Sequence, residues 1–98
     1  MLQRGPLEMD LDRYRVTVDG AEVHLTPVEF RLLQTLLESP ERAFTRDQLL
    51  NHIYAHHEAF SIDRAIDVHV GKVRQKLGDD PDRPRFIATV RGVGYKLL

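Results

Sequence analysis

The segment that decides the fold is SIDRAIDVHVGKVRQKL, residues 61–77, which has the apolar period of a helix. At about 100° per residue, one set of side chains falls within a narrow apolar stripe and a second, mostly polar set clusters on the opposite side. The stripe consists of Ile66, Val70, Val73 and Leu77, and the opposite side carries Arg64, Asp67, Val68, Gly71, Lys72 and Gln75. We expect the stripe to pack into a core.

The outer side of this helix combines hydrogen-bond donors, an acceptor and an apolar contact. That mixture can be placed against base edges in the major groove of DNA, which is our first hypothesis. The alternative is an ordinary amphipathic surface helix whose outer side is merely solvated.

The composition limits the classes of protein to consider. With 98 residues the chain is expected to form one domain, residues 1–98. Cysteine is absent, so disulfides and thiolate metal sites are excluded. The sequence contains neither a signal peptide nor a long apolar run, so we expect a cytoplasmic protein with no membrane association.

The charge is unevenly distributed along the chain. A net charge of -1 argues against a nucleic-acid binder, because such domains usually carry a basic excess. Residues 1–60, however, hold 6 Lys and Arg against 10 Asp and Glu, whereas residues 61–98 hold 8 against 5. Positive charge therefore collects in the half that contains the helix.

The first 25 residues have the alternating pattern of strands. Leu7, Met9 and Leu11 share one side, and Tyr14, Val16, Val18, Val23 and Leu25 continue the alternation. Asp19-Gly20 is a strong hairpin signal, because glycine accepts the positive φ of a type I′ turn. We predict an N-terminal four-stranded antiparallel sheet over residues 1–25, with Leu2 and Gln3 in its first strand.

Two further helices are marked by capping boxes, completing a three-helix core over residues 26–78. Thr26-Pro27-Val28-Glu29 predicts a helix to about Glu38, and Thr45-Arg46-Asp47-Gln48 predicts one to about Tyr54 or Ala55. Glu29 lies within an apolar arc, where a catalytic carboxylate is conceivable. Capping is the favoured role, because that position of the box requires an acid or amide.

The C-terminal part predicts a hairpin. Gly78 should end the third helix, residues 63–77, and residues 79–85, with two prolines, should form a loop. Residues 86–98 then supply two strands around the tip Arg91-Gly92-Val93-Gly94. In a winged helix such an arginine enters the minor groove, and the alternative is a solvated loop side chain.

The histidines raise the question of metal binding. His52 and His56 are four residues apart and could share a helix face, with His57 next to them. Zinc needs further ligands, and neither cysteine nor an HExxH motif accompanies them, so we expect no metal and no cofactor. The sequence also offers no nucleophile with a base, so we expect no enzymatic activity.

Four motifs in order, LTPVEFRLLQTLL, TRDQLLNHIY, RAIDVHVGKVRQKL and FIATVRGVGYKL, resemble the DNA-binding effector domain of the OmpR/PhoB family of response regulators. The resemblance covers essentially the whole chain. It implies an α+β winged helix-turn-helix fold that binds double-stranded DNA to regulate transcription, within a two-component phosphorelay. It also implies dimers on direct-repeat half-sites and monomers off DNA, and a receiver domain ahead of this one in full-length members. A contact with RNA polymerase through the loop 55–61 is implied as well.

The resemblance also implies residue roles. Asp67, Val68 and Lys72 occupy base-contact positions in the major groove, and Arg91 is the minor-groove residue. Phosphate contacts fall on Tyr54, Arg64, His69, Arg74 and Tyr95. For Asp67 the alternative is a structural partner for a nearby cation.

The sequence departs from the family pattern at two positions. Gly71 stands where members often carry arginine, and Tyr54 stands where many carry tryptophan. We interpret Gly71 as one missing phosphate contact, although a closer approach of the helix backbone to DNA is the alternative. Gly71 and the acidic first half leave open a second function, a winged-helix protein-interaction module that has lost DNA binding.

Overall fold

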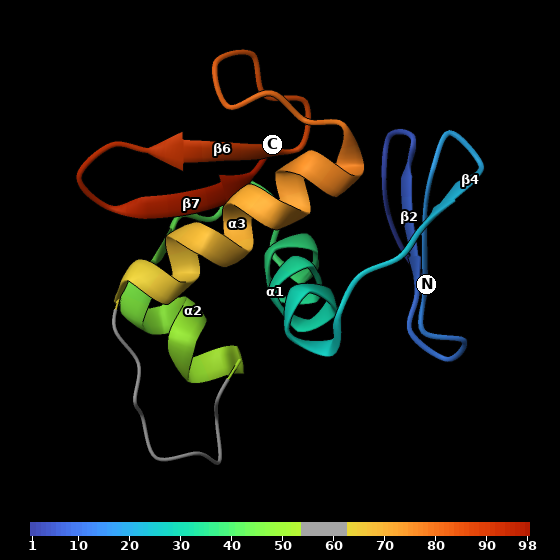
Figure 1. Ribbon diagram of the computed structural model, residues 1–98, viewed down its shortest axis with the longest axis horizontal. Helices are drawn as coiled ribbons and strands as arrows, with labels where there is room; N and C mark the ends of the chain where they lie inside the picture. Colours follow the sequence, from blue (N-terminus) through green and yellow to red (C-terminus); the bar gives the residue numbers. More distant parts are fainter. Residues whose placement is uncertain (54–62) are drawn as a thin grey trace.

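The computed structural model describes residues 1–53 and 63–98, without the side chains of residues 63–65. The described residues form two small sheets and three helices (Figure 1). The elements are β1 (Leu2–Arg4), β2 (Leu7–Asp10), β3 (Arg15–Val18), β4 (Ala21–Val23), α1 (Pro27–Glu38), β5 (Phe44–Thr45), α2 (Arg46–Ile53), α3 (Asp63–Leu77), β6 (Ile87–Val90) and β7 (Gly94–Leu97). This is the predicted winged helix-turn-helix architecture.

The N-terminal sheet is antiparallel with the order β1-β2-β3-β4. Its inner side buries Leu7, Met9 and Val16, as the alternation predicts. Asp19 and Gly20 both have positive φ, and Val18 pairs with Ala21 across them, which is the expected two-residue turn.

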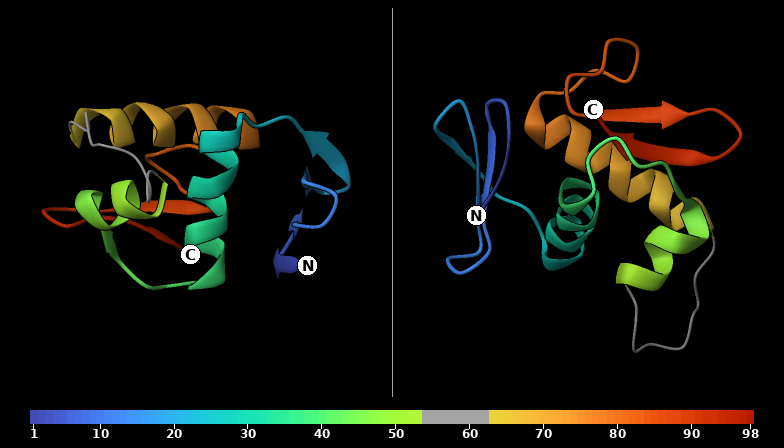
Figure 2. Two further views of the ribbon diagram at one scale, coloured as in Figure 1. Left: turned by 90° about the horizontal axis from the view of Figure 1, so that it is seen from below. Right: turned by 180° about the vertical axis from the view of Figure 1, so that it is seen from behind.

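Tyr14 corrects the predicted alternation. It lies outside the strands with φ 56°, and its ring is exposed and stacks on Phe30 of α1 at 3.9 Å between centroids. Figures 1 and 2 show α1 between the N-terminal sheet and the rest of the chain. The tyrosine thus joins the sheet to this central helix rather than lining one of its strands.

Both capping boxes are present. The Thr26 backbone N–H donates to Glu29 Oε1 at 3.0 Å, and the Glu29 N–H donates to Thr26 Oγ1 at 3.3 Å. Thr45 and Gln48 exchange the same pair of bonds at the start of α2. Glu29 is therefore a capping residue, as favoured.

Glu29 also connects α1 with α3. Its carboxylate is almost completely buried and accepts a 2.6 Å bond from Lys76 Nζ. Burial raises the pKa of this carboxyl, but the bonds from Lys76 and Thr26 outweigh it and hold the pKa below the ordinary value of 4.5.

We expect Glu29→Gln to lose stability relative to wild type most strongly at neutral pH. Because the folded-state pKa is lowered, the carboxylate contributes fully above pH 4.5 and loses its contribution as pH falls through the folded value. Urea unfolding between pH 7 and pH 3 should show the gap between the two proteins narrowing only below about pH 4.5. Lys76→Met removes the cation that lowers the folded-state pKa of Glu29, so in that background the narrowing should be smaller. An unchanged profile would contradict the ion pair.

The second sheet has the order β5-β7-β6, so the C-terminal hairpin is extended by a strand from the middle of the chain. The sequence did not predict β5. Phe44 pairs with Tyr95, and Thr45 pairs with Gly94. Gly94 is the first residue of β7 and does not belong to the turn, contrary to the expectation. A Cβ on Gly94 would lie 2.1 Å from the carbonyl oxygen of Phe44, so this pairing requires glycine.

The loop after α3 is organised by one buried side chain. Gly78 ends the helix with φ 73°, and the Asp79 N–H donates to the Arg74 carbonyl at 2.8 Å. The Asp79 carboxylate then accepts from the backbone N–H groups of Arg85, Phe86 and Ile87 at 2.6–3.2 Å. These bonds carry the chain from the loop into β6.

The apolar stripe of α3 is buried throughout, as predicted, together with the inner sides of α1 and α2. None of the helices in residues 1–53 and 63–98 is long and apolar enough to cross a membrane.

Candidate nucleic-acid interface

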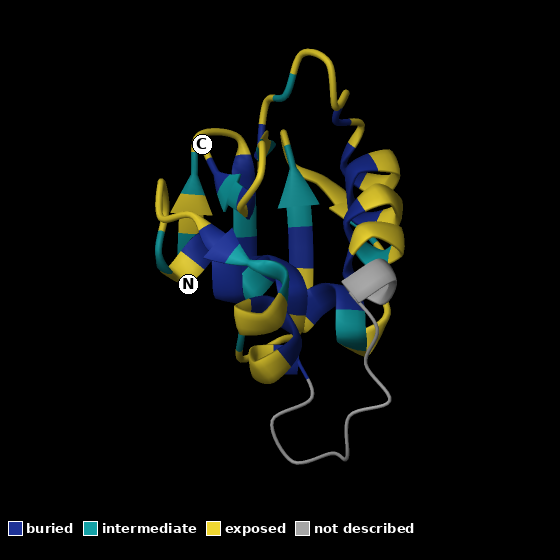
Figure 3. Cartoon of the chain, turned by 90° about the vertical axis from the view of Figure 1, so that its left-hand side faces the viewer, coloured by how far each residue is buried: buried dark blue, intermediate teal, exposed yellow. Residues whose placement is uncertain are grey.

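The outward side of α3 is the exposed surface that the helical period predicted (Figure 3). Val68 is 52% exposed, unusually high for a large apolar side chain of this domain. Gly71, Lys72 and Gln75 are exposed on the same side. Gln75 was not among the predicted site residues, although its amide can both donate and accept and it lies two turns beyond Val68.

The flanks of this side are fixed to other elements. Asp67 and Arg74 lie on the flank toward the C-terminal hairpin, and Lys76, bonded to Glu29, lies on the other flank. An exposed ridge of the helix thus lies between two flanks that are bonded to other elements.

Asp67 has protein partners. Its Oδ1 accepts a 2.9 Å bond from Arg46 Nε and a 2.5 Å bond from the Tyr95 hydroxyl. The Tyr95 bond lowers the pKa of the Asp67 carboxyl, burial opposes this, and Arg46 lowers it further. This arrangement matches the alternative considered for Asp67, a structural partner for a nearby cation.

Arg74 differs from the position expected of a phosphate contact. The residue is 8% exposed, and its guanidinium donates to the Ile87 carbonyl at 3.0 and 3.3 Å and to Thr89 Oγ1 at 2.9 Å. Its donors are directed into β6, so in this structure Arg74 attaches α3 to the hairpin. A phosphate contact by Arg74 stays a prediction of the family resemblance.

Tyr95 is likewise buried, at 5% exposure, and its hydroxyl donates to Asp67. Burial raises the pKa of the Tyr95 hydroxyl, and the bond to Asp67 raises it further. The proton that a phosphate contact would require is already donated within the protein.

Of the other predicted phosphate contacts, only His69 has a described side chain. His69 is partly exposed on α3, and the backbone of Arg64 lies in the first turn of that helix. The whole of loop 55–61 lies outside the described residues, as do Tyr54, His56 and His57.

Arg91 lies at the tip of the C-terminal hairpin and is exposed, with the exposed Val93 in the same turn. Gly92 adopts φ 79°, and the Val93 N–H donates to the Val90 carbonyl at 2.9 Å. This closed turn projects the arginine from the end of β6, as predicted.

The described residues offer little for other chemistry. No group of three His, Asp or Glu side chains in residues 1–53 and 63–98 could hold a metal ion. His52 Nδ1 lies 3.0 Å from the Gln48 carbonyl oxygen, and its ring meets Phe44 edge-on.

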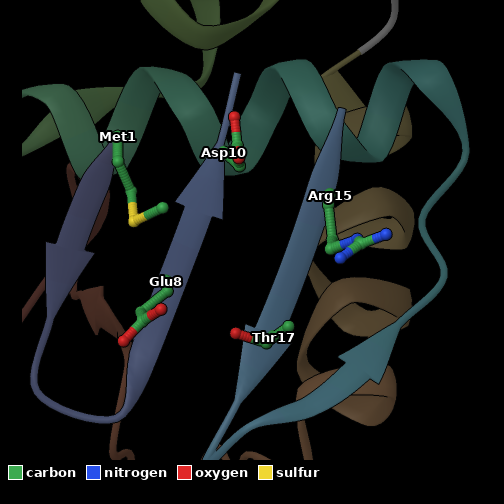
Figure 4. A pocket seen from close by; sticks show the side chains of 5 residues that line it. All are labelled: Met1, Glu8, Asp10, Arg15 and Thr17. Atoms are coloured by element: carbon green, nitrogen blue, oxygen red, sulfur yellow. The ribbon is translucent and has the colours of Figure 1, made fainter. Parts of the chain in front are cut away.

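A pocket on the outer face of the N-terminal sheet is lined by Met1, Glu8, Asp10, Arg15 and Thr17 (Figure 4).

Comparison with known proteins agrees with this geometry. The family described as "Transcriptional regulatory protein, C terminal" matches residues 20–97. The DNA-binding response regulator MtrA of Mycolicibacterium smegmatis is 42% identical over 96 residues, which cover 98% of this chain and 42% of that protein. The phosphate regulon transcriptional regulatory protein PhoB of Rhizobium meliloti is 43% identical over 97 residues, with 99% and 42% covered.

Among solved structures, the DNA-binding domain of Klebsiella pneumoniae RstA in complex with the RstA box superposes with a TM-score of 0.87 at 30% identity, covering 98% of this chain and 94% of that one. The chain spans 42% of the length of the two response regulators above. The matched segment, the winged-helix fold and the exposed face of α3 lead to one conclusion: the chain belongs to the transcriptional regulatory protein C-terminal family and is an effector domain of the OmpR/PhoB response-regulator type.

Proposed function

We propose that this chain binds double-stranded DNA sequence-specifically, with α3 in the major groove. The β6–β7 hairpin is the wing, and its tip lies in the adjacent minor groove. The observation that carries the proposal is the exposed ridge of Val68, Lys72 and Gln75 on a helix whose flanks are fixed. A helix of this kind fits the width of the major groove. MtrA is named as a DNA-binding regulator, and the RstA domain was solved with its DNA box, which supports the same role here.

Within this proposal Val68 and Lys72 contact bases. A valine methyl group suits the methyl group of thymine, and a lysine ammonium suits the acceptors of guanine. Arg91 enters the minor groove, where narrow A·T-rich stretches concentrate negative potential. Arg64, His69 and Tyr54 remain proposed phosphate contacts, on the family resemblance.

The larger assembly follows the same resemblance. We propose a cytoplasmic two-component regulator in which a receiver domain precedes this one and two copies bind head-to-tail on direct repeats. RNA polymerase would be contacted through the loop 55–61. The domain itself would have no catalytic activity.

Mobility shifts of labelled genomic fragments across a salt series test the proposal. Phosphate contacts release counterions on binding, so affinity should fall steeply as salt rises. Sequence-specific retardation at low salt is the expected result. No retarded species even at about 50 mM salt, where electrostatic binding is strong, would favour the protein-interaction module instead.

Lys72→Ala is expected to relax base preference at one position of the site. Loss of a base contact should cost about 1–3 kcal/mol on the preferred duplex and much less on a random one. Titration of both duplexes at fixed salt measures the difference. Arg83→Ala, which removes one exposed cation from the loop after α3, is the matched control. Equal losses on both duplexes for Lys72→Ala would contradict base reading.

Gly71→Arg is expected to raise affinity for all duplexes. The space around Gly71 is open, so an added side chain meets nothing within 4 Å, and a cation there would gain a phosphate. The same titration, with Gly71→Ala as the control for helix propensity, measures the gain. An arginine variant that binds no better than the alanine variant would contradict the missing-contact interpretation.

A further inference from the structure

The strongest feature that the proposed contacts leave unused is a set of bonds between α3 and the wing. Asp67 on α3 accepts hydrogen bonds through one oxygen from Tyr95 on β7 and from Arg46 on α2. Its side chain is 44% exposed, yet this oxygen is shared by two donors from separate elements. A carboxylate engaged in this way would have to release a partner before that oxygen could accept from a base.

A second attachment lies further along the same flank. Arg74 is seven residues after Asp67, which places it within about 20° on the helix and about 10 Å along the axis. It donates to Ile87 and Thr89 of β6. The Tyr95 ring joins the two attachments, because the Arg46 and Arg74 guanidinium carbons lie 5.6 and 5.5 Å from its centroid.

Two attachments restrict the orientation of the hairpin relative to α3 more than a single attachment would. A hairpin held at a single point can pivot about that point, whereas one held at points about 10 Å apart along a helix keeps a fixed angle to it. Tyr95 is four residues from Arg91 along the hairpin, and Asp67 directly precedes Val68. The bonds therefore join the proposed minor-groove residue to the proposed base-reading side of α3 through short, hydrogen-bonded segments.

We propose that Asp67 is a positioning residue: with Tyr95 and Arg46 it fixes the angle between the wing and α3, so that the two grooves are engaged together. This rests on the proposed function, since it assigns how that DNA surface is held. It replaces the base contact expected of Asp67 and the phosphate contact expected of Tyr95. Arg46, which carried no expected role, becomes a positioning residue through its bond to Asp67.

A double-mutant cycle between Tyr95→Phe and Arg91→Ala tests the inference. Tyr95→Phe removes only the hydroxyl and keeps the ring between the two cations. On a duplex selected by the wild-type protein from a random pool, we expect it to weaken binding about fivefold to tenfold, which lies within the range found for coupled neighbouring residues. In the Arg91→Ala background, Tyr95→Phe should weaken binding by less than about twofold. The arginine whose position depends on the Tyr95 hydroxyl is then no longer present. Unfolding curves confirm that all four proteins are folded at the temperature used.

A second readout separates positioning from base reading. Selection from a random pool with Asp67→Asn should return the wild-type site at reduced affinity. A changed base at one position would show that Asp67 reads DNA and would overturn the inference. Additive losses in the cycle, or an unchanged dissociation constant for Tyr95→Phe, would also overturn it while the wild-type protein still binds. A wild-type protein that retards no duplex would overturn the proposed function and this inference with it.

Discussion

Replacing Gly94 with alanine is expected to lower the free energy of unfolding by about 3 kcal/mol, the upper end of what overpacking costs. A Cβ at this position would lie 2.1 Å from the Phe44 carbonyl oxygen and 3.1 Å from Thr45 Cα, which are backbone atoms that cannot rotate away. Relief of the contact requires separating β5 from β7. Urea unfolding followed by circular dichroism measures the loss.

Gly92→Ala, in the turn of the same hairpin, is the matched control. An added methyl group meets nothing within 4 Å there, but φ is +79°, so the cost is the backbone strain of about 1–2 kcal/mol. Gly94→Ala should therefore be clearly the less stable of the two variants. Similar stabilities would contradict the close approach of β5 to β7.

Asp79→Ala is the second large effect, and we expect a loss of about 3 kcal/mol or more in unfolding free energy. The carboxylate is buried and accepts three backbone N–H groups, and each donor left without a partner costs about 1–3 kcal/mol. Part of the loss should be recovered where water enters the site. The measurement is again equilibrium unfolding at neutral pH.

Asp82→Ala provides the comparison, because it removes a carboxylate of the same charge from an exposed position three residues away. Surface substitutions of this kind usually change stability by less than about 0.5 kcal/mol. Hydrogen exchange adds a local readout: the amides of Phe86 and Ile87 should lose protection in Asp79→Ala alone. Retained protection there would show that the carboxylate does not hold the entry to β6.

The helices and the N-terminal sheet could be predicted because their signals are local. Thr26 and Glu29 specify the start of α1 within four residues, and the 4-3-4 spacing of the stripe specifies which side of α3 is buried. Asp19-Gly20 specifies its turn by the φ angles it permits. Each of these choices depends on neighbours along the chain and not on the rest of the fold.

The short strand β5 could not be predicted for the opposite reason. Two residues have no period, and their pairing with Tyr95 and Gly94 joins positions about fifty residues apart. The signal that existed was the second glycine of RGVG, which the sequence alone assigned to a turn. Only the folded structure shows why Gly94 must lack a side chain, because the Phe44 backbone lies where a Cβ would be.

The candidate site divides in the same way. Val68 and Lys72 were predicted to point outward, and they are exposed. The helical angle placed Asp67 on the outer side of α3, but Asp67 and Arg74 both lie at the edge of that side, next to the hairpin. At an edge the angle does not decide whether a side chain faces solvent or a neighbouring element. The hydrogen-bond partners of Asp67 and Arg74 on β6 and β7 decide it, and those partners follow in the sequence only after a loop. Sequence reasoning therefore identified the surface but not the bonds that hold it.

The order β5-β7-β6 has a consequence for building chimaeric regulators. Because β7 is the central strand, transplanting residues 86–98 alone would separate the hairpin from the pairing surface of residues 44–45 and from its partners on α3. A functional exchange would have to carry Phe44, Asp67 and Arg74 along with the hairpin. The unit to exchange is thus a set of positions that are far apart in the sequence, and the whole set would have to be exchanged to transfer DNA specificity.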